Sequence, residues 1–203
     1  MSRSKTLLLA AALALPPGIA AAQPAGALGQ VQAHLRAVSS LTANFAQTDR
    51  RGQTLTGSLL LKRPGHIRFE YQKGVPLLIV GDGKAINVVD YQVKRVQRWP
   101  IGNSPLSVLL DPSQDISRIA KVIRDDAVGI AVQARDPKRP EFGTITLYFS
   151  RGGGPGGLTL HGWRILDSQN NTTEIRLSNQ RFNVAVADSS FRFQDPRGRG
   201  PKG

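Results

Sequence analysis

The sequence contains no cysteine among its 203 residues. The fold therefore uses no disulfide, although disulfides are common in small exported domains. Thiol nucleophiles and cysteine metal ligands are excluded for the same reason. N-terminal acylation of exported bacterial proteins needs a cysteine at the cleavage site, so this chain is not itself acylated there.

Long apolar runs are missing as well. The longest, Leu7 to Leu15, is too short to span a bilayer, and a Pro-Pro-Gly segment that breaks helices follows it closely. Arg3 and Lys5 precede this run, and a small-x-small pattern ends at Ala22. A positive segment, a short apolar core and a small-residue site together indicate a secretory signal peptide.

Acidic residues are scarce relative to basic ones, at 14 against 27, which gives a formal net charge of +13. Removal of residues 1–22 takes away two basic residues and leaves a net charge of +11. This excess favours an anionic partner or surface. Because the chain is predicted to be exported, we expect anionic lipid head groups rather than nucleic acid. Basic residues in loops also aid solubility, and that explanation stays open.

No motif for catalysis or metal binding is present. His34, His66 and His161 are scattered without metal-ligand spacing, and no Gly-x-Ser-x-Gly elbow occurs. Asp125 and Asp126 are the only adjacent carboxylates, and neighbours in a strand point to opposite faces. We therefore expect a binding protein that is not an enzyme and that needs neither cofactor nor metal.

Apolar residues change their spacing once near the N-terminus. In residues 28–38 they recur every three or four positions, which predicts a helix with one apolar stripe. Beyond Ser40 they alternate with polar residues, which predicts strands, and an Asp-Gly pair at 82–83 predicts a hairpin. The predicted strands cover 41–45, 55–61, 67–71, 77–80, 85–89, 93–99, 117–124, 127–135, 143–150, 158–167 and 172–180.

A short helix interrupts this series of strands. Ser104 is suited to cap it, Pro105 to occupy its first position, and three leucines give it an apolar face. Two helices cannot cover so many strands evenly. The pattern predicts an α+β fold of mainly antiparallel strands, a curved and incompletely closed barrel with the helices over its concave face. Such a face is a natural apolar ligand cavity.

One segment, Gly57 to Tyr71, is far more specific than the rest. It contains a Gly-led strand, a Lys-Arg-Pro turn and an aromatic strand, and an Asp-Gly-Lys hairpin follows within 79–84. With the helix-to-strand junction at 38–47 and the Phe-Arg-Phe segment at 191–193, this order resembles the outer-membrane lipoprotein carrier family, LolA. The resemblance covers nearly all of the chain beyond residue 22.

The resemblance implies a half-open antiparallel barrel with a helical lid. It implies a monomeric periplasmic carrier that takes acylated lipoproteins from an inner-membrane lipoprotein-releasing ABC transporter. The cargo then passes to an outer-membrane lipoprotein acceptor or to the membrane itself, without cofactor, covalent chemistry or nucleic acid. The expected organisation is a signal peptide at 1–22, one carrier domain at 23–196 and a basic disordered tail at 197–203, with a flexible loop at 152–157.

Arg63 matches the arginine by which the family latches its lid from the barrel side. Pro64 favours an extended conformation for Arg63, whose guanidinium can donate to the open carbonyls of a short helix. The family usually has tryptophan at the position of Phe69 and often an aromatic residue at that of Ile67, so the cavity has a different shape here. The residues expected to bind acyl chains are Ile67, Phe69, Leu35, Leu106, Leu109 and Leu110, and the four leucines are expected to line the lid.

Other functions remain open from the sequence alone. A carrier of lipids or glycolipids on the same fold would also use the basic surface. A strand-rich periplasmic hydrolase would need a polar cluster in the cavity, which the sequence does not suggest. A soluble protein that both carries cargo and inserts it into the outer membrane is compatible with the missing cysteine.

We predict cleavage after Ala22 during export, because the positive segment, the apolar core and the small-residue site occur in the required order. The intact mass of protein from the periplasmic fraction should begin at Gln23. Full-length protein retained in the inner membrane would contradict both the compartment and the carrier function.

Overall fold

The computed structural model describes residues 26–111 and 113–198, and the predicted signal peptide lies outside these residues. The elements are mainly strands. They are α1 (Gly26–Ala37), β1 (Ser40–Thr48), β2 (Thr54–Lys62), β3 (His66–Tyr71), β4 (Leu77–Asp82), β5 (Ala85–Asp90), β6 (Arg95–Pro100), η1 (Ile101–Asn103), α2 (Ser107–Leu110), η2 (Ile116–Arg118), β7 (Ala120–Asp125), β8 (Gly129–Ala134), η3 (Pro140–Phe142), β9 (Thr144–Arg151), η4 (Pro155–Gly157), β10 (Leu158–Leu166), β11 (Thr172–Phe182) and η5 (Asp188–Phe191).

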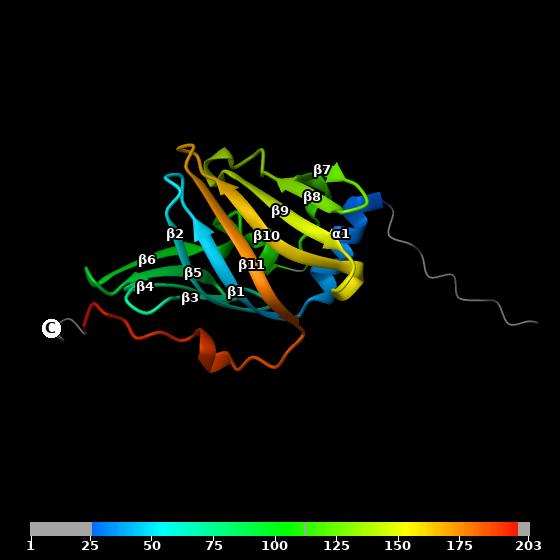
Figure 1. Ribbon diagram of the computed structural model, residues 1–203. Helices are drawn as coiled ribbons and strands as arrows, with labels where there is room; N and C mark the ends of the chain where they lie inside the picture. The colour runs from blue at the N-terminus through cyan, green and yellow to red at the C-terminus, as the bar shows by residue number, and fades with distance from the viewer. Residues whose placement is uncertain (1–25, 112, 199–203) are drawn as a thin grey trace, which may run out of the picture.

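All eleven strands form one antiparallel sheet in the order β6-β5-β4-β3-β2-β1-β11-β10-β9-β8-β7. Each half is a meander, and the pairing of β1 with β11 joins the halves at the centre of the sheet. Within the described chain, β6 and β7 are the two free edges. The sheet curls without closing (Figure 1), which confirms the predicted half-open antiparallel barrel.

The main core fills the concave side of the sheet. Side chains from α1 and α2 pack there against alternating residues of the strands, so the two helices lie over the concave face as predicted. No helix in the described ranges is long and apolar enough to cross a membrane. The fully buried large side chains are Trp163, Leu35, Leu41, Leu59, Leu61, Ile67, Leu109, Leu110, Ile116, Ile130, Ile145 and Leu147.

Two local predictions were wrong. Residues 116–118 form a 3-10 turn instead of the start of a strand, because the Asp115 carboxylate accepts the Ser117 N–H at 2.9 Å and caps the turn. The short helix begins at Ser107 rather than at Pro105. Ser104 accepts the N–H of Leu106 at 3.2 Å and of Ser107 at 3.0 Å, so a separate turn precedes the helix.

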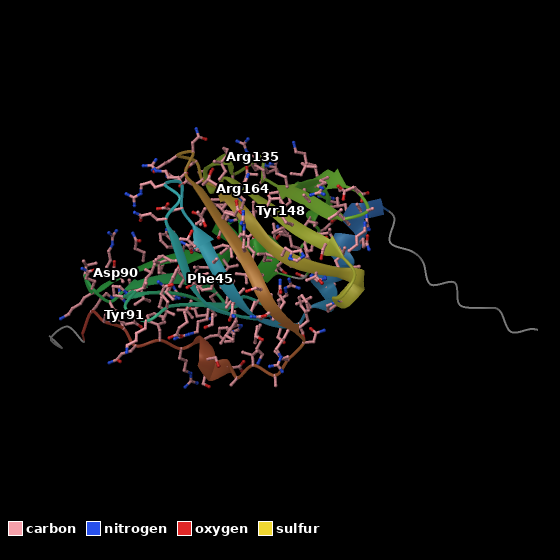
Figure 2. The ribbon with its side chains drawn as sticks, in the orientation of Figure 1. Phe45, Asp90, Tyr91, Arg135, Tyr148 and Arg164 are labelled. Atoms are coloured by element: carbon pink, nitrogen blue, oxygen red, sulfur yellow. The ribbon has the colours of Figure 1, made fainter. Side chains whose placement is uncertain are left out.

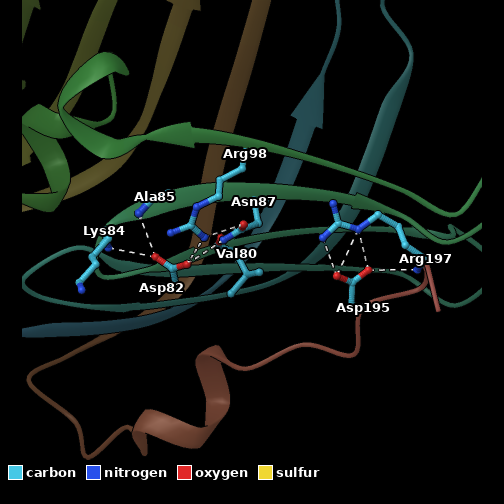
Figure 3. Close-up of polar contacts among 8 residues, drawn as sticks. All are labelled: Val80, Asp82, Lys84, Ala85, Asn87, Arg98, Asp195 and Arg197. Atoms are coloured by element: carbon cyan, nitrogen blue, oxygen red, sulfur yellow. Dashed lines mark hydrogen bonds and ion pairs between the residues drawn. The ribbon is translucent and has the colours of Figure 1, made fainter. Parts of the chain in front are cut away.

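The predicted hairpin at 82–83 connects β4 and β5, and its acidic residue organises it (Figure 3). The Asp82 carboxylate accepts the backbone N–H groups of Lys84 and Ala85, and also pairs with Asn87 and Arg98. Partial burial raises the pKa of Asp82, but the hydrogen bond from the Ala85 N–H and the pairing with Arg98 outweigh this effect and lower it. Asp82 is therefore a structural carboxylate.

The chain beyond β11 crosses the convex face of β2, β3 and β4 (Figure 1). Lys62 donates to the Val186 oxygen at 3.1 Å, and Arg68 donates to the Arg192 oxygen at 3.1 Å. Phe191 anchors the segment in a second apolar cluster, with Leu78, Val80 and Val89.

The predicted disordered tail at 197–203 falls mostly outside the described residues. Its first residue, Arg197, forms an ion pair with Asp195 at 2.6 Å (Figure 3). The side chains of Arg197 and Asp195 are about half exposed, so this pair adds little stability.

Gly57 permits the close approach of β2 to β3. A β-carbon added there would lie 2.0 Å from the Glu70 backbone oxygen and 2.8 Å from the Phe45 ring. We predict that Gly57→Ala lowers the free energy of unfolding by about 1–3 kcal/mol, the usual effect of overpacking. Gly102→Ala is the control, because nothing lies within 4 Å of the β-carbon it would add. Equal urea-denaturation midpoints for the two variants would contradict this account.

Candidate functional site: the concave face and Arg63

The predicted lining residues of β3 lie on the concave face. Ile67 is paired with Leu61 of β2, and Phe69 is paired with Leu59. Ile67 is fully buried and Phe69 nearly so. Because alternate residues of a strand share a face, the four side chains form one continuous apolar surface.

An aromatic cluster that the sequence pattern did not predict widens this surface. The Phe45 ring, on β1 (Figure 2), makes edge-to-face contacts with Phe69 and Tyr71, each at 5.2 Å between centroids. Phe69 also contacts Trp163 of β10 in the same geometry at 6.1 Å. Phe45 and Tyr71 follow the period of two and flank Gly57 of β2 through two consecutive hairpins, whereas the contact with Trp163 depends on strand pairing distant in sequence.

Tyr71 brings a hydroxyl group to this cluster. Its hydroxyl donates to the Gln47 side-chain oxygen at 2.7 Å, and burial raises its pKa to about 12. The phenol is therefore neutral at physiological pH, and its hydrogen bond holds the ring against Phe45. The surface stays apolar in character.

The four predicted lid leucines complete the same core cluster. Leu35 extends from α1, Leu106 directly precedes α2, and Leu109 and Leu110 belong to α2. All four are buried, and Leu109 and Leu110 are completely so. Their side chains pack in one cluster with the aliphatic and aromatic residues of the concave face, so this is a closed conformation.

Arg63 connects both helices to the barrel. It follows β2, and its side chain donates from Nε to the Leu109 oxygen at 2.7 Å and from Nη1 to the Val38 oxygen at 2.7 Å. A further contact joins Nη1 to the Leu35 oxygen. The next turn adds a backbone bond, from the Gly65 N–H to the Leu110 oxygen at 3.0 Å. One side chain thus reaches the C-terminal ends of α1 and α2.

The charge of Arg63 is balanced by backbone dipoles. No salt bridge to it occurs within residues 26–111 and 113–198, and its partners are carbonyl oxygens of helix ends that lack helical donors. Burial lowers the pKa of Arg63 to about 10. The guanidinium therefore stays protonated at neutral pH and keeps its full set of donors.

His34 ties α1 to a different part of the barrel. The buried imidazole has Nδ1 at 2.7 Å from the Pro155 oxygen, and its ring packs edge-on against Phe149 and Phe182. Burial is the main reason why its pKa is lowered, and the Arg63 charge adds to the effect. His34 is therefore a neutral structural residue.

The predicted flexible loop at 152–157 contains the η4 turn, and the Pro155 oxygen that His34 contacts belongs to this turn. At Gly156, where φ is +67°, a β-carbon would lie 3.2 Å from the His34 backbone. Glycine is therefore needed for the close approach of the turn to α1.

The other two histidines lie elsewhere. His66 Nδ1 is 2.7 Å from the Pro64 oxygen, and His161 Nε2 is 2.9 Å from the Ser150 hydroxyl. In the part of the chain that the structure covers, no group of three or more His, Cys, Asp or Glu residues could hold a metal ion. The described concave face combines apolar surface with one partly buried guanidinium, an arrangement suited to binding apolar ligands.

Comparison with known proteins agrees with this architecture. The model of the family described as outer membrane lipoprotein carrier protein LolA matches residues 36–194. The outer-membrane lipoprotein carrier protein of Chromobacterium violaceum is 33% identical over 202 residues, covering 95% of this chain and 94% of its own length. That of Dechloromonas aromatica is 31% identical, covering 98% of this chain and 96% of its own length. This chain belongs to the outer membrane lipoprotein carrier protein family, LolA.

Proposed function

We propose that this protein is a periplasmic carrier that holds the acyl chains of lipoproteins against its concave face on the way from the inner to the outer membrane. The observation that carries this proposal is the position of Arg63, which fastens two helices over a wide apolar surface through bonds to backbone carbonyls alone. The names of the relatives support the same cargo.

The cargo explains why such a surface must be covered and uncovered. Exposing a sixteen-carbon acyl chain to water costs roughly 12 kcal/mol, at about 0.8 kcal/mol per methylene. In the closed conformation the lid leucines already fill the concave face, so an acyl chain must replace them. Apolar contacts are then exchanged rather than lost, and the closed and loaded states can have similar free energies.

The route of the cargo sets the partners. An inner-membrane lipoprotein-releasing ABC transporter supplies the lipoprotein, and an outer-membrane acceptor or the membrane itself receives it. The carrier acts as a monomer and performs no covalent chemistry. A lipid or glycolipid carrier is the second candidate, because a net charge of +11 after signal cleavage suits a phosphorylated lipid. The lipid species that co-purify with the protein distinguish the two.

Arg63→Leu should trap cargo on the carrier. The change removes charge-assisted hydrogen bonds that hold the closed lid and are worth about 1.5–3 kcal/mol net. This loss shifts the balance towards the open, loaded form by roughly 10- to 100-fold. We expect the variant to fold, to accept lipoprotein and to release it poorly. The measurement is lipoprotein co-purified per carrier, with transfer to outer-membrane vesicles.

Arg68→Leu is the matched control. Arg68 also donates to backbone carbonyls, but these belong to the C-terminal segment and not to the lid. It should therefore load and release cargo like the wild type. If Arg63→Leu also behaves like the wild type, Arg63 is not the latch. If Arg63→Leu unfolds, its role is structural.

An apolar fluorescent probe should bind the purified protein at one saturable site. Because Arg63→Leu weakens the closed state, the variant should bind the probe roughly 10- to 100-fold more tightly. Fluorescence titration measures both affinities, and Arg68→Leu should match the wild type. Tight stoichiometric zinc binding, or turnover of ester or glycosidic substrates, would contradict the carrier function.

A further inference from the structure

Exposed apolar side chains lie on the hairpins at both free edges of the sheet. Among the described residues, seven large hydrophobic side chains are exposed; the β5–β6 hairpin carries three of them, and the β7–β8 hairpin carries three others, Val122, Ile123 and Val128. Tyr91 and Val93, at 39% and 64% exposure, lie in the turn of the β5–β6 hairpin, and Trp99 lies further along β6. This β5–β6 hairpin is at a free edge of the sheet, and its tip is far from α1 (Figure 2).

Cations surround the two apolar residues of the turn. Lys94 and Arg95 follow directly and are exposed. The neighbouring β3–β4 turn adds exposed Lys73, and the two turns are joined by a bond from the Tyr91 N–H to the Pro76 oxygen at 2.8 Å. We call this surface the hairpin patch; it consists of Lys73, Pro76, Tyr91, Val93, Lys94 and Arg95.

The hairpin patch keeps an excess of positive charge, because Asp90, the cross-strand partner of Arg95, is one carboxylate beside three cations. None of the salt bridges within the described chain involves its lysines or its arginine. The nearest acidic residue in sequence, Asp90, uses its carboxylate to accept the N–H groups of Gln92 and Val93 at 2.9 and 3.2 Å. It thereby builds the turn that presents Val93 to solvent.

We propose that the hairpin patch docks on the surface of a bilayer that contains anionic phospholipid. Tyr91 and Val93 enter the head-group region, where amphipathic aromatic rings and short aliphatic side chains are favoured. Lys73, Lys94 and Arg95 lie against the lipid phosphates. The proposal rests on the proposed carrier function and extends it, because the hairpin patch would be the surface at which cargo leaves the carrier.

The size of the hairpin patch favours a lipid surface over a protein. A stable protein interface takes about 20–30 residues a side, far more than the six residues of two adjoining turns. A bilayer needs no matching shape, because mobile head groups gather around a few cations. Single exposed apolar residues are ordinary, but two of them ringed by three cations form a pattern typical of interfacial binding.

The hairpin patch also adjoins the apolar interior. Val75 lies between Lys73 and Pro76 in the β3–β4 turn, and it is partly buried against the main core. Leu77, at the start of β4, packs in the same way. A bilayer held at the patch would therefore border the edge of the concave surface. An acyl chain leaving that surface there would meet lipid before water.

The test is co-sedimentation of the empty, mature protein with vesicles of phosphatidylcholine, with and without phosphatidylglycerol. Wild-type protein should bind only the anionic vesicles. Lys94→Gln/Arg95→Gln should weaken binding about 25-fold at low salt, since one surface cation contributes roughly a factor of five. Tyr91→Ser/Val93→Ser should weaken it about tenfold or more, and this loss should persist at high salt.

Two control variants match these changes. Arg50→Gln/Arg51→Gln removes an exposed basic pair from the β1–β2 hairpin, which carries no exposed large apolar residue. Val128→Ser removes a 69% exposed valine from the β7–β8 turn at the opposite end of the strands. Both controls should bind anionic vesicles within about twofold of the wild type. In a Trp99→Phe background the other tryptophan, Trp163, is buried and gives a constant signal, and Tyr91→Trp should add emission that shifts to the blue on these vesicles.

Three outcomes overturn the proposal. If the wild-type protein does not bind anionic vesicles, the proposal is wrong. The carrier function then still stands if Arg63→Leu traps cargo. An equal loss in the Arg50→Gln/Arg51→Gln control would show that only total charge acts. Hairpin variants that bind vesicles normally but fail to transfer cargo to outer membranes containing protein would place a protein partner on the patch.

Discussion

A protonated, partly buried guanidinium at the ends of two helices needs acceptors, and this requirement determines how the helices lie on the barrel. Arg63 obtains them from the backbone oxygens of Leu35, Val38 and Leu109. The acceptors belong to helix ends, where carbonyl groups lack helical donors and their dipoles favour a cation. The carbonyls satisfy the guanidinium and the guanidinium satisfies the carbonyls, so the two arrangements stabilise each other. Opening the lid breaks this set of bonds while the sheet keeps its own.

The sheet and the lid differ in how many hydrogen bonds hold them, and this difference divides the protein into a fixed part and a part that can open. The α2 helix has four residues and cannot be stable by itself, so its position depends on tertiary contacts. The sheet has ten antiparallel strand pairings, which do not involve α2. Segments with few bonds to the rest of a protein open at a lower free energy than its core. Cargo can therefore displace the lid without unfolding the barrel.

Much of this arrangement could be predicted from local patterns in the sequence. Alternation, an Asp-Gly hairpin signal and strand-like apolar runs together identified eleven strands, and the period of two placed Ile67 and Phe69 on one face. The pairing of β1 with β11 could not be read in this way, because it joins residues more than a hundred positions apart. For that reason the contact of Phe69 with Trp163 was missed. The resemblance to the LolA family indicated that Arg63 contacts the lid. Spacing alone does not show that the ends of two helices meet at this residue.

The latch and the hairpin patch lie at opposite ends of the same strands. Arg63 directly precedes the β2–β3 turn, and Lys73 follows β3, whose six residues span about 20 Å. A bilayer at Lys73 and Tyr91 therefore cannot touch the guanidinium, and any coupling has to pass through the apolar interior between them. In the proposed carrier function, an acyl chain lying along Phe69 would fill that interior and keep the lid leucines away. Once the chain moves into lipid, the leucines can return and Arg63 regains its carbonyl partners. Membrane contact would then favour closure without any direct contact between the two sites.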